Sequence, residues 1–164
     1  MGQVIVGRVK IVPPQWPQYE IEHPLDFQLG ERFALRGYHL TPSEVRPGEE
    51  LHLTLYWQAL EDGDRDYTVF VHLLDQEGRM LDQADAQPLG GGYPTSFWGR
   101  GELIQDGYIL SLPPQTPPGA YKIEVGMYLL ATGERLPVKD AEGVRVPGDR
   151  IPLGPVQVVI PEGK

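Results

Sequence analysis

The stretch ELHLTLYWQAL, residues 50–60, decides the fold class. Apolar and polar side chains alternate along it with a period of two, which is typical of a β-strand that buries one face. One face carries Leu51, Leu53, Leu55 and Trp57. The other face carries His52, Thr54, Tyr56 and Gln58. The first of these faces is therefore predicted to be a core face.

The same alternation, bounded by Gly and Pro, recurs on both sides of this strand. The predicted strands are 3–12, 31–40, 50–60, 67–75, 79–85, 102–112, 120–130, 135–138 and 151–160. Short, evenly spaced strands with Pro/Gly turns are typical of an all-β sandwich or barrel. We expect a single domain over 1–164 with an immunoglobulin-like or jelly-roll-like antiparallel β-sandwich of about nine strands. Residues 1–24 are expected to form an N-terminal strand and a Pro-rich connector that pack on the sandwich.

A tyrosine follows the segment PPGA at residue 121 and enters a long predicted strand. Immunoglobulin-like sandwiches place a structural tyrosine at such a corner, where its hydroxyl bonds to backbone a few residues upstream. Tyr121 is therefore interpreted as structural. The sequence predicts one core that includes Leu53, Leu55, Trp57, Val69, Val71, Tyr121, Val125 and Trp98.

The stretch GGGYPTSFWGRG, residues 90–101, is the first candidate binding site. Tyr and Trp stack on flat ligands, and glycine allows close approach of backbone. A platform made of Tyr93, Phe97 and Trp98 is one interpretation. In the other, the loop folds back as a plug over an open end of the sandwich. We favour the plug for Trp98 and expect Tyr93 to be the more exposed aromatic residue.

A second candidate site depends on how two strands pair. If 50–60 and 67–75 form a hairpin, they share a half-polar, aromatic face that could hold a ligand. Its residues are His52, Thr54, Tyr56, Gln58, Thr68, Phe70 and His72, of which His52, Tyr56 and His72 are the ligand-binding candidates. If the connection crosses between sheets, as in many immunoglobulin-like folds, the two histidines are separated. A third interpretation is a sheet face covered by the N-terminal strand and connector.

The residue types argue against several classes of function. The net charge of −9 disfavours binding to nucleic acid. There is no Cys, no G-x-S-x-G elbow and no H-x-x-x-H pattern, so we expect no catalytic residues, no metal site and no cofactor. The acidic loops 61–66 and 139–150 could cage Ca²⁺, although we interpret them as solvated turns.

The chain has no Asn and 17 Pro, a composition reported for thermophilic proteins and also expected from a GC-rich genome. It contains no apolar run of about 20 residues, so this segment is not expected to insert into a membrane. The N-terminus does not resemble a signal peptide. The chain is therefore either cytoplasmic or a piece of a longer protein, and we favour the second.

Four segments together resemble a known kind of domain: 35–59 with RPG followed by LHLTLYW, 66–81 with VFVHL, 90–138 with YPTSFW and PPGAY, and 153–158 with LGPVQV. They are similar to the C-terminal β-sandwich of bacterial glycosyltransferase family 39-type, mannosyltransferase-like membrane proteins. The resemblance implies an extracytoplasmic, non-catalytic accessory module whose partner is glycan or the membrane part of the parent. The alternative is a purely structural or protein-interaction domain without a small-molecule ligand.

Overall fold

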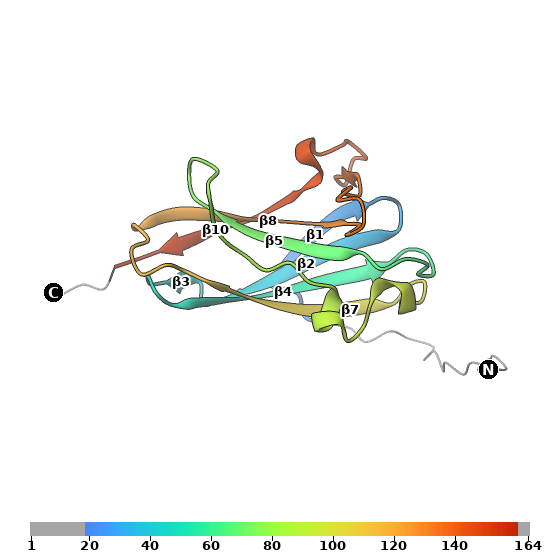
Figure 1. Cartoon of the computed structure of the whole chain (residues 1–164), viewed down its shortest axis with the longest axis horizontal. Coiled ribbons are helices and arrows are strands. Elements are labelled where there is room, and N and C mark those ends of the chain that lie inside the picture. The colour runs from blue at the N-terminus through green and yellow to red at the C-terminus, as the bar shows by residue number, and fades with distance from the viewer. Residues whose placement is uncertain (1–18, 161–164) are drawn as a thin grey trace.

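The computed structural model describes residues 19–160, which form two stacked β-sheets (Figure 1). Sheet A has the order β7 (Leu103–Ser111), β4 (Glu50–Ala59), β2 (Phe33–Thr41), β1 (His23–Leu29) and β9 (Val138–Lys139). Sheet B has the order β3 (Glu44–Val45), β10 (Ile151–Val158), β8 (Gly119–Tyr128), β5 (Thr68–Leu74) and β6 (Met80–Gln83). Three short 3₁₀ turns are η1 (Pro88–Gly91), η2 (Thr95–Phe97) and η3 (Pro147–Asp149).

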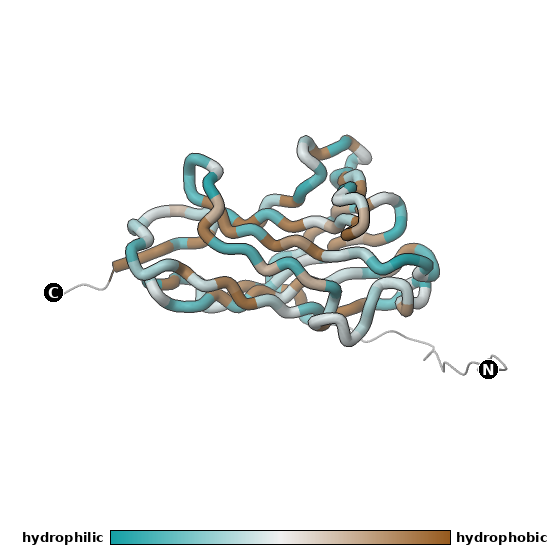
Figure 2. The backbone as a smooth tube through the Cα atoms, viewed as in Figure 1, coloured by the Kyte–Doolittle hydropathy of each residue, from teal (hydrophilic) through white to brown (hydrophobic). Residues whose placement is uncertain are grey.

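The predicted all-β sandwich is confirmed. Neighbouring strands are antiparallel in both sheets, apart from the short parallel pair of β3 and β10. Apolar residues concentrate along the strands and polar residues at the turns (Figure 2). The two inner faces therefore supply the core between the layers.

The predicted core is also confirmed. All eight residues named from the sequence belong to one buried cluster, and Leu53, Leu55 and Trp57 on β4 are fully buried. Val69 and Val71 of β5 face them from the other sheet. Burying large aliphatic and aromatic side chains stabilises a fold by ~1.5–3 kcal/mol each, so this row contributes substantially to stability.

The connection from β4 to β5 crosses between the sheets, so of the two arrangements left open by the sequence the crossing is present and the hairpin of 50–60 with 67–75 is not. β4 pairs with β2 and β7, whereas β5 pairs with β8 and β6. Both strands have an apolar odd face, and placing them in opposite layers lets each face cover the other. The predicted hairpin over 67–86 is present as β5 and β6.

Strand β1 was not predicted, because Pro24 and the preceding Pro-rich stretch read as connector. A register shift between Pro24 and Phe27 lets the strand include the proline. The predicted strand 3–12 and the connector up to residue 18 lie outside the described residues. Residues 19–22 run over the outer face of sheet A, where Ile21 lies against Gly37 and the Tyr19 ring is 5.4 Å from that of Tyr56.

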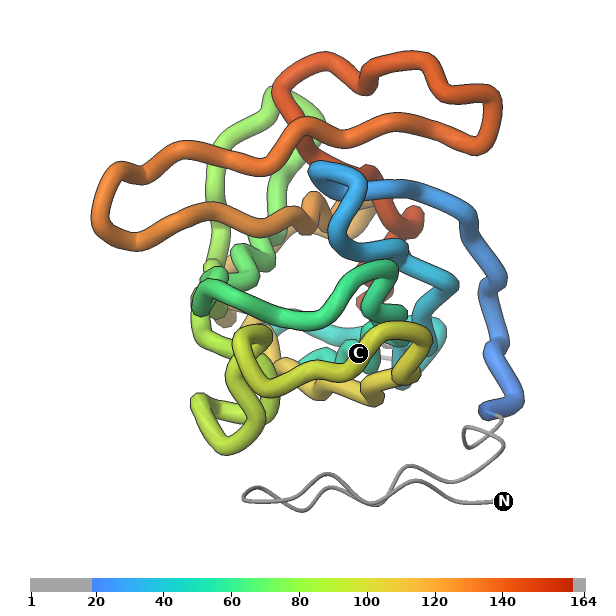
Figure 3. Tube along the Cα trace, turned by 90° about the vertical axis from the view of Figure 1, so that its right-hand side faces the viewer, coloured from blue at the N-terminus to red at the C-terminus, as the bar shows by residue number. Residues whose placement is uncertain are grey.

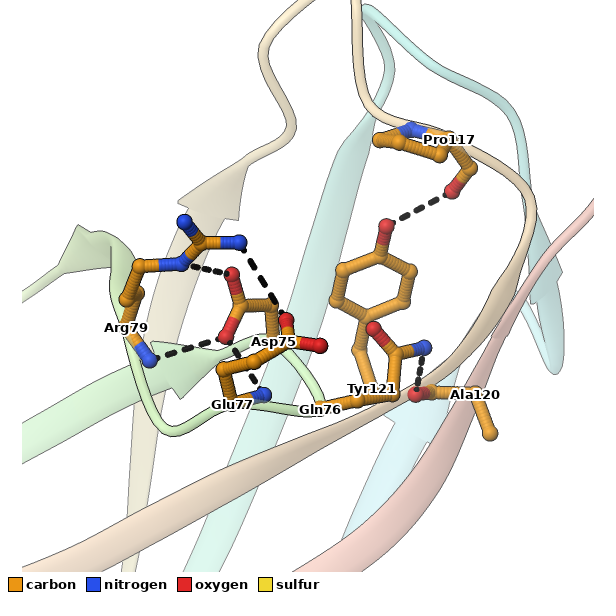
Figure 4. Close-up of polar contacts among 7 residues, drawn as sticks. All are labelled: Asp75, Gln76, Glu77, Arg79, Pro117, Ala120 and Tyr121. Carbon is orange, nitrogen blue, oxygen red and sulfur yellow. Dashed lines mark hydrogen bonds and ion pairs between the residues drawn. The ribbon is translucent and has the colours of Figure 1, made fainter.

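The predicted tyrosine corner is present at one end of the sandwich (Figure 4). The buried Tyr121 hydroxyl donates to the carbonyl oxygen of Pro117 at 2.7 Å. Beside it, the Asp75 carboxylate accepts hydrogen bonds from the Arg79 backbone and guanidinium, which lower the pKa of Asp75. The Gln76 amide joins this turn to the Ala120 carbonyl at 2.6 Å. These bonds fix the path of the chain into β8.

Replacing Tyr121 by Phe removes only the hydroxyl and leaves the Pro117 carbonyl without its donor. We expect the free energy of unfolding to fall by about 1–2 kcal/mol, the typical cost of one lost buried hydrogen bond. Urea denaturation of Tyr121→Phe and wild type at pH 7 measures this difference. Equal midpoints and slopes would show that the corner bond contributes nothing.

Candidate functional site

The glycine-rich loop 90–101 is a plug, as favoured from the sequence. Trp98 is only 2% exposed, and its ring meets Phe33 edge to face at 5.4 Å. The indole nitrogen donates to the Tyr93 carbonyl at 3.0 Å, and the Trp98 carbonyl accepts the Gly63 amide at 2.9 Å. A side chain at Gly63 would collide with the Thr95 carbonyl, so the glycine permits this close approach. The indole therefore closes one end of the core.

The other two aromatic residues of the loop differ in exposure. Tyr93 is partly buried and packs on the core, and its hydroxyl donates to the Glu102 carboxylate at 2.8 Å. Burial, together with Glu102, raises the pKa of Tyr93 to about 12. Phe97 is 55% exposed. The expectation that Tyr93 is the more exposed aromatic was therefore wrong, because its hydroxyl is held by Glu102.

A buried carboxylate ties the beginning of this loop to sheet A. Asp106 on β7 is fully buried and accepts hydrogen bonds from the Tyr108 hydroxyl at 2.6 Å, the Leu89 amide at 2.9 Å and the Trp57 indole at 3.3 Å. Burial raises the pKa of Asp106, and these three donors oppose the shift. The carboxylate has all its donors within the protein, so its role here is structural.

The sheet faces separate the predicted histidine and tyrosine candidates. Tyr56 is 5% exposed on the outer face of sheet A, with Tyr19 beside it, and its hydroxyl accepts from Gln105 at 3.3 Å. His52 lies further along β4, with an exposed imidazole 3.9 Å from Glu50. His72 belongs to β5 of sheet B, so it shares no surface with His52 or Tyr56.

His72 lines a pocket on the outer face of sheet B. The pocket has a volume of about 200 Å³ and is lined by Phe70, His72, Asp85, Tyr128, Gly133 and Arg135. The residues come from β5, from β8, and from the segments that follow β6 and β8. The loops on either side of β9, which join β8 to β10, project from the molecule (Figure 3). Aromatic and ionisable side chains thus meet in a recess that opens to solvent.

The carboxylate of Asp85 is the centre of the pocket's polar contacts. Its Oδ2 accepts the Tyr128 hydroxyl at 3.1 Å, and its Oδ1 lies 3.7 Å from Nε2 of His72. The amides on either side of it, from Ala84 and Ala86, donate to backbone carbonyls of β5. These two bonds hold Asp85 in place above the sheet.

The floor and one wall of the pocket are equally fixed. Phe70 is 1% exposed although it points away from the core, and it lies over Gly126, where any side chain would collide with the ring. The Arg135 guanidinium lies over the Phe70 ring, 4.2 Å from its centroid. Its Nη1 donates to the Gly148 carbonyl at 2.9 Å. A cation placed over an aromatic face is attracted by the ring's quadrupole, so the guanidinium is positioned at the rim.

Burial shifts the pKa values of two groups in the pocket, the His72 imidazole and the Tyr128 phenol. Desolvation lowers the pKa of His72, with Asp85 opposing the shift and Arg135 adding to it. Desolvation and the bond to Asp85 raise the pKa of Tyr128. At neutral pH the pocket therefore presents a neutral imidazole, a phenol, a carboxylate and a guanidinium.

Of the ligand-binding candidates, His72 is the one placed in this pocket, together with Phe70 of the same predicted face. Asp85, Tyr128 and Arg135 were not predicted. The available signal was the outward row of β8, in which Gly126 and Tyr128 follow the alternation that buries Val125 and Met127. Nothing in the sequence indicated that the turns after β6 and β8 fold over the same patch.

Two further recesses line the surface of the described residues. One of about 380 Å³ lies between the β1–β2 turn and the segment around Leu136, and one of about 410 Å³ lies beside the tyrosine corner. The first has no aromatic lining residue, and in the second the Tyr121 hydroxyl is already bonded. Within 19–160, no three His, Asp or Glu side chains gather as metal ligands. Over the same range no helix is long and apolar enough to cross a membrane.

Comparison with known proteins establishes the fold alone. No protein-family model matches the chain, and no curated protein matches it significantly. The crystal structure of the C-terminal domain of Wzt is similar, with a TM-score of 0.57, 16% identity, and coverage of 88% of this chain and 83% of that one. A Niemann-Pick type C2 protein from the Japanese carpenter ant aligns less well, with a TM-score of 0.46 and 8% identity over 86% of this chain and 100% of that one.

Because Trp98 fills the end of the core, Trp98→Ala leaves a cavity. We expect it to lower the free energy of unfolding by roughly 3–5 kcal/mol, as large-to-small core substitutions do. Thermal and urea unfolding measure the loss, and Phe97→Ala on the same loop is the matched control, expected to change stability little. If Trp98→Ala melts with the wild type, the indole does not stabilise the core.

The burial of Tyr93, together with its hydrogen bond to Glu102, predicts a stability change at alkaline pH. Its folded pKa of about 12 lies above the unfolded value of about 10, so its contribution is complete below pH 10 and is lost as pH rises to 12. The stability of Tyr93→Phe should therefore depend less steeply on pH in this window than that of the wild type. Denaturation at several pH values between 9 and 12 tests this, and parallel curves would contradict it.

Proposed function

We propose that this chain is a non-catalytic accessory β-sandwich module that binds saccharide in the pocket on the outer face of sheet B. The observation that carries the proposal is the convergence of Tyr128, Asp85, His72 and Arg135 around the buried ring of Phe70. A concave site with an apolar base and a few fixed polar groups is the usual form of a small-molecule site.

The polar groups suit a ligand rich in hydroxyls. Each sugar hydroxyl both donates and accepts, so a sugar site needs donors and acceptors side by side. Asp85 supplies acceptor oxygens, Arg135 supplies donors, and a neutral His72 supplies one of each. Hydrogen bonds to charged groups are about twice as strong as neutral ones, and Arg and carboxylate groups can contact two hydroxyls at once.

The dimensions favour a short ligand. A volume of about 200 Å³ is below the range of roughly 300–1,000 Å³ for drug-sized ligands. We therefore propose that the pocket accepts one sugar ring, such as the end of a chain. The partly exposed Tyr128 ring offers the face on which the apolar side of a sugar would stack.

The cellular setting follows from the sequence resemblance. We infer that the domain belongs to a membrane-anchored parent of the glycosyltransferase family 39 type and works outside the cytoplasm, with glycan as its partner. The likeness to the Wzt domain supports the sandwich and adds no ligand. Fold by itself does not confer function, so the pocket chemistry is the stronger support.

The alternative is a structural or interaction domain, and the plug loop favours it. Trp57 and Trp98 are buried, and the Tyr93 hydroxyl is bonded to Glu102, so the predicted aromatic platform serves mainly to pack the core. The two functions differ in whether the sheet B pocket binds anything.

Calorimetric and NMR titration of the protein with a panel of hexoses, including mannose, tests the proposal. We expect at least one sugar to shift the signals of His72 and Tyr128. Asp85→Asn removes the charged acceptor while keeping the shape, and it should weaken binding at least about tenfold, the equivalent of about 1.4 kcal/mol. Phe97→Ala on the plug loop is the control and should bind as the wild type does.

Two results would overturn the proposal. The absence of heat and of signal shifts at millimolar sugar throughout the panel would favour the structural alternative. Binding that survives in Asp85→Asn and fails in Phe97→Ala would move the site to the loop 90–101. Melting curves of both variants separate loss of binding from loss of fold.

A further inference from the structure

Strand β7 lies at one edge of sheet A, and it is much longer than the other strands that end the two sheets. Sheet A ends at β9 and β7, and sheet B ends at β3 and β6. Three of these edges are two to four residues long, whereas β7 has nine. Long edges present rows of free amide and carbonyl groups that can template another strand. In residues 19–160, β7 is therefore the edge that most needs a partner.

The hydrogen bonds at the end of β7 show which groups face outward. The Leu112 amide donates to Glu49 beside β4, and the Ser111 amide donates away from β4 to the Asp82 carboxylate. Because the direction alternates along a strand, the amides of Gln105, Gly107 and Ile109 also point away from β4. None of the three bonds to a backbone carbonyl in the range 19–160.

The side chains that β7 presents on the outer face of sheet A lack the features that usually prevent an edge strand from pairing. They are Gln105, Gly107, Ile109 and Ser111, with no charge and no proline among them. Ile109 is 52% exposed, and the space beside Gly107 is empty. Natural edge strands commonly carry Lys, inward charges or Pro to prevent pairing. The one charge on β7, Asp106, points inward and is bonded to Trp57, Leu89 and Tyr108, so it does not cover the amides that face away from β4. These amides are open to a further strand.

The path of the chain before β1 leads to this edge. His23 pairs with β2, Ile21 lies against Gly37 of β2, and Tyr19 contacts Tyr56 of β4. The chain therefore crosses β1, β2 and β4 in that order as the residue number falls. The next strand in the sheet is β7, which pairs with Tyr56 through Gln105. Neighbouring strands are about 4.8 Å apart, and six extended residues reach about 20 Å, so residues 13–18 can span the remaining distance.

We propose that residues 3–12, QVIVGRVKIV, add to the outer edge of β7 as a sixth strand of sheet A. Polar and apolar residues alternate over 8–11. The odd row holds Ile5, Val9 and Ile11, and the even row holds Arg8 and Lys10 together with three valines, Val4, Val6 and Val12. On this edge the apolar row covers the flank of the sandwich beside β7. Arg8 and Lys10 then supply at the new edge the charges that β7 lacks.

Amide hydrogen exchange measured by NMR on the full chain tests this. The Gln105, Gly107 and Ile109 amides should be protected in the wild type. Val6→Pro together with Val9→Pro places two prolines in the added strand. Because amide direction alternates, one of them removes a donor that faces β7, and the pair should speed exchange of these amides by about 100-fold or more. Gln15→Pro, in the already Pro-rich connector, is the matched control and should leave their protection unchanged. Amides of β8, which is paired on both sides, report whether each variant is folded.

A second measurement does not depend on the proline variant folding. The chain has no cysteine, so Gln3→Cys provides a single position for a spin label. The label should broaden signals of residues on the outer edge of β7 within the same molecule. Broadening seen only when labelled and isotope-enriched chains are mixed, or protection that rises with protein concentration, would assign the edge to a second copy. Exchange that is equally fast in wild type and the double proline variant would also overturn the proposal.

Discussion

The structure depends on burying the apolar face of β4 against the opposite sheet. β4 lies inside sheet A, and Leu53, Leu55 and Trp57 on its inner face are completely buried. No strand beside β4 in the same sheet could cover that face. The chain must therefore leave sheet A after Ala59 and form its next strand, β5, in sheet B. There Val69 and Val71 cover the apolar face of β4. The separation of the two histidines follows directly from this constraint.

The two ends of the sandwich are closed by different means, and both rely on aromatic residues with a bonded polar group. Trp98 closes one end and donates to the Tyr93 carbonyl, while Tyr121 at the other end donates to Pro117. Buried Tyr and Trp find hydrogen-bond partners because an unpaired donor in the core is costly. These residues are committed to stability, which leaves the outer sheet faces and the β7 edge as the surfaces available for recognition.

The surfaces proposed for ligand and for strand addition lie on different sheets. The saccharide pocket is on the outer face of sheet B, and the open edge belongs to sheet A. The domain could then use residues 3–12 to complete its fold while the pocket remains free for a ligand.

The sequence by itself determined the strand at 50–60, its buried face and the tyrosine corner, because alternation and turn residues are local properties. For Trp98 it favoured an inward position and left the exposed platform open. Only the tertiary structure decided which strands are neighbours. It separated His52 from His72, and it brought Asp85, Tyr128 and Arg135 around Phe70. Alternation identifies the buried face of a strand but carries no information about its partner, since pairing is set by contacts between residues distant in sequence. The residues that line the pocket are spread through the sequence from Phe70 to Arg135, so no local pattern could have located it.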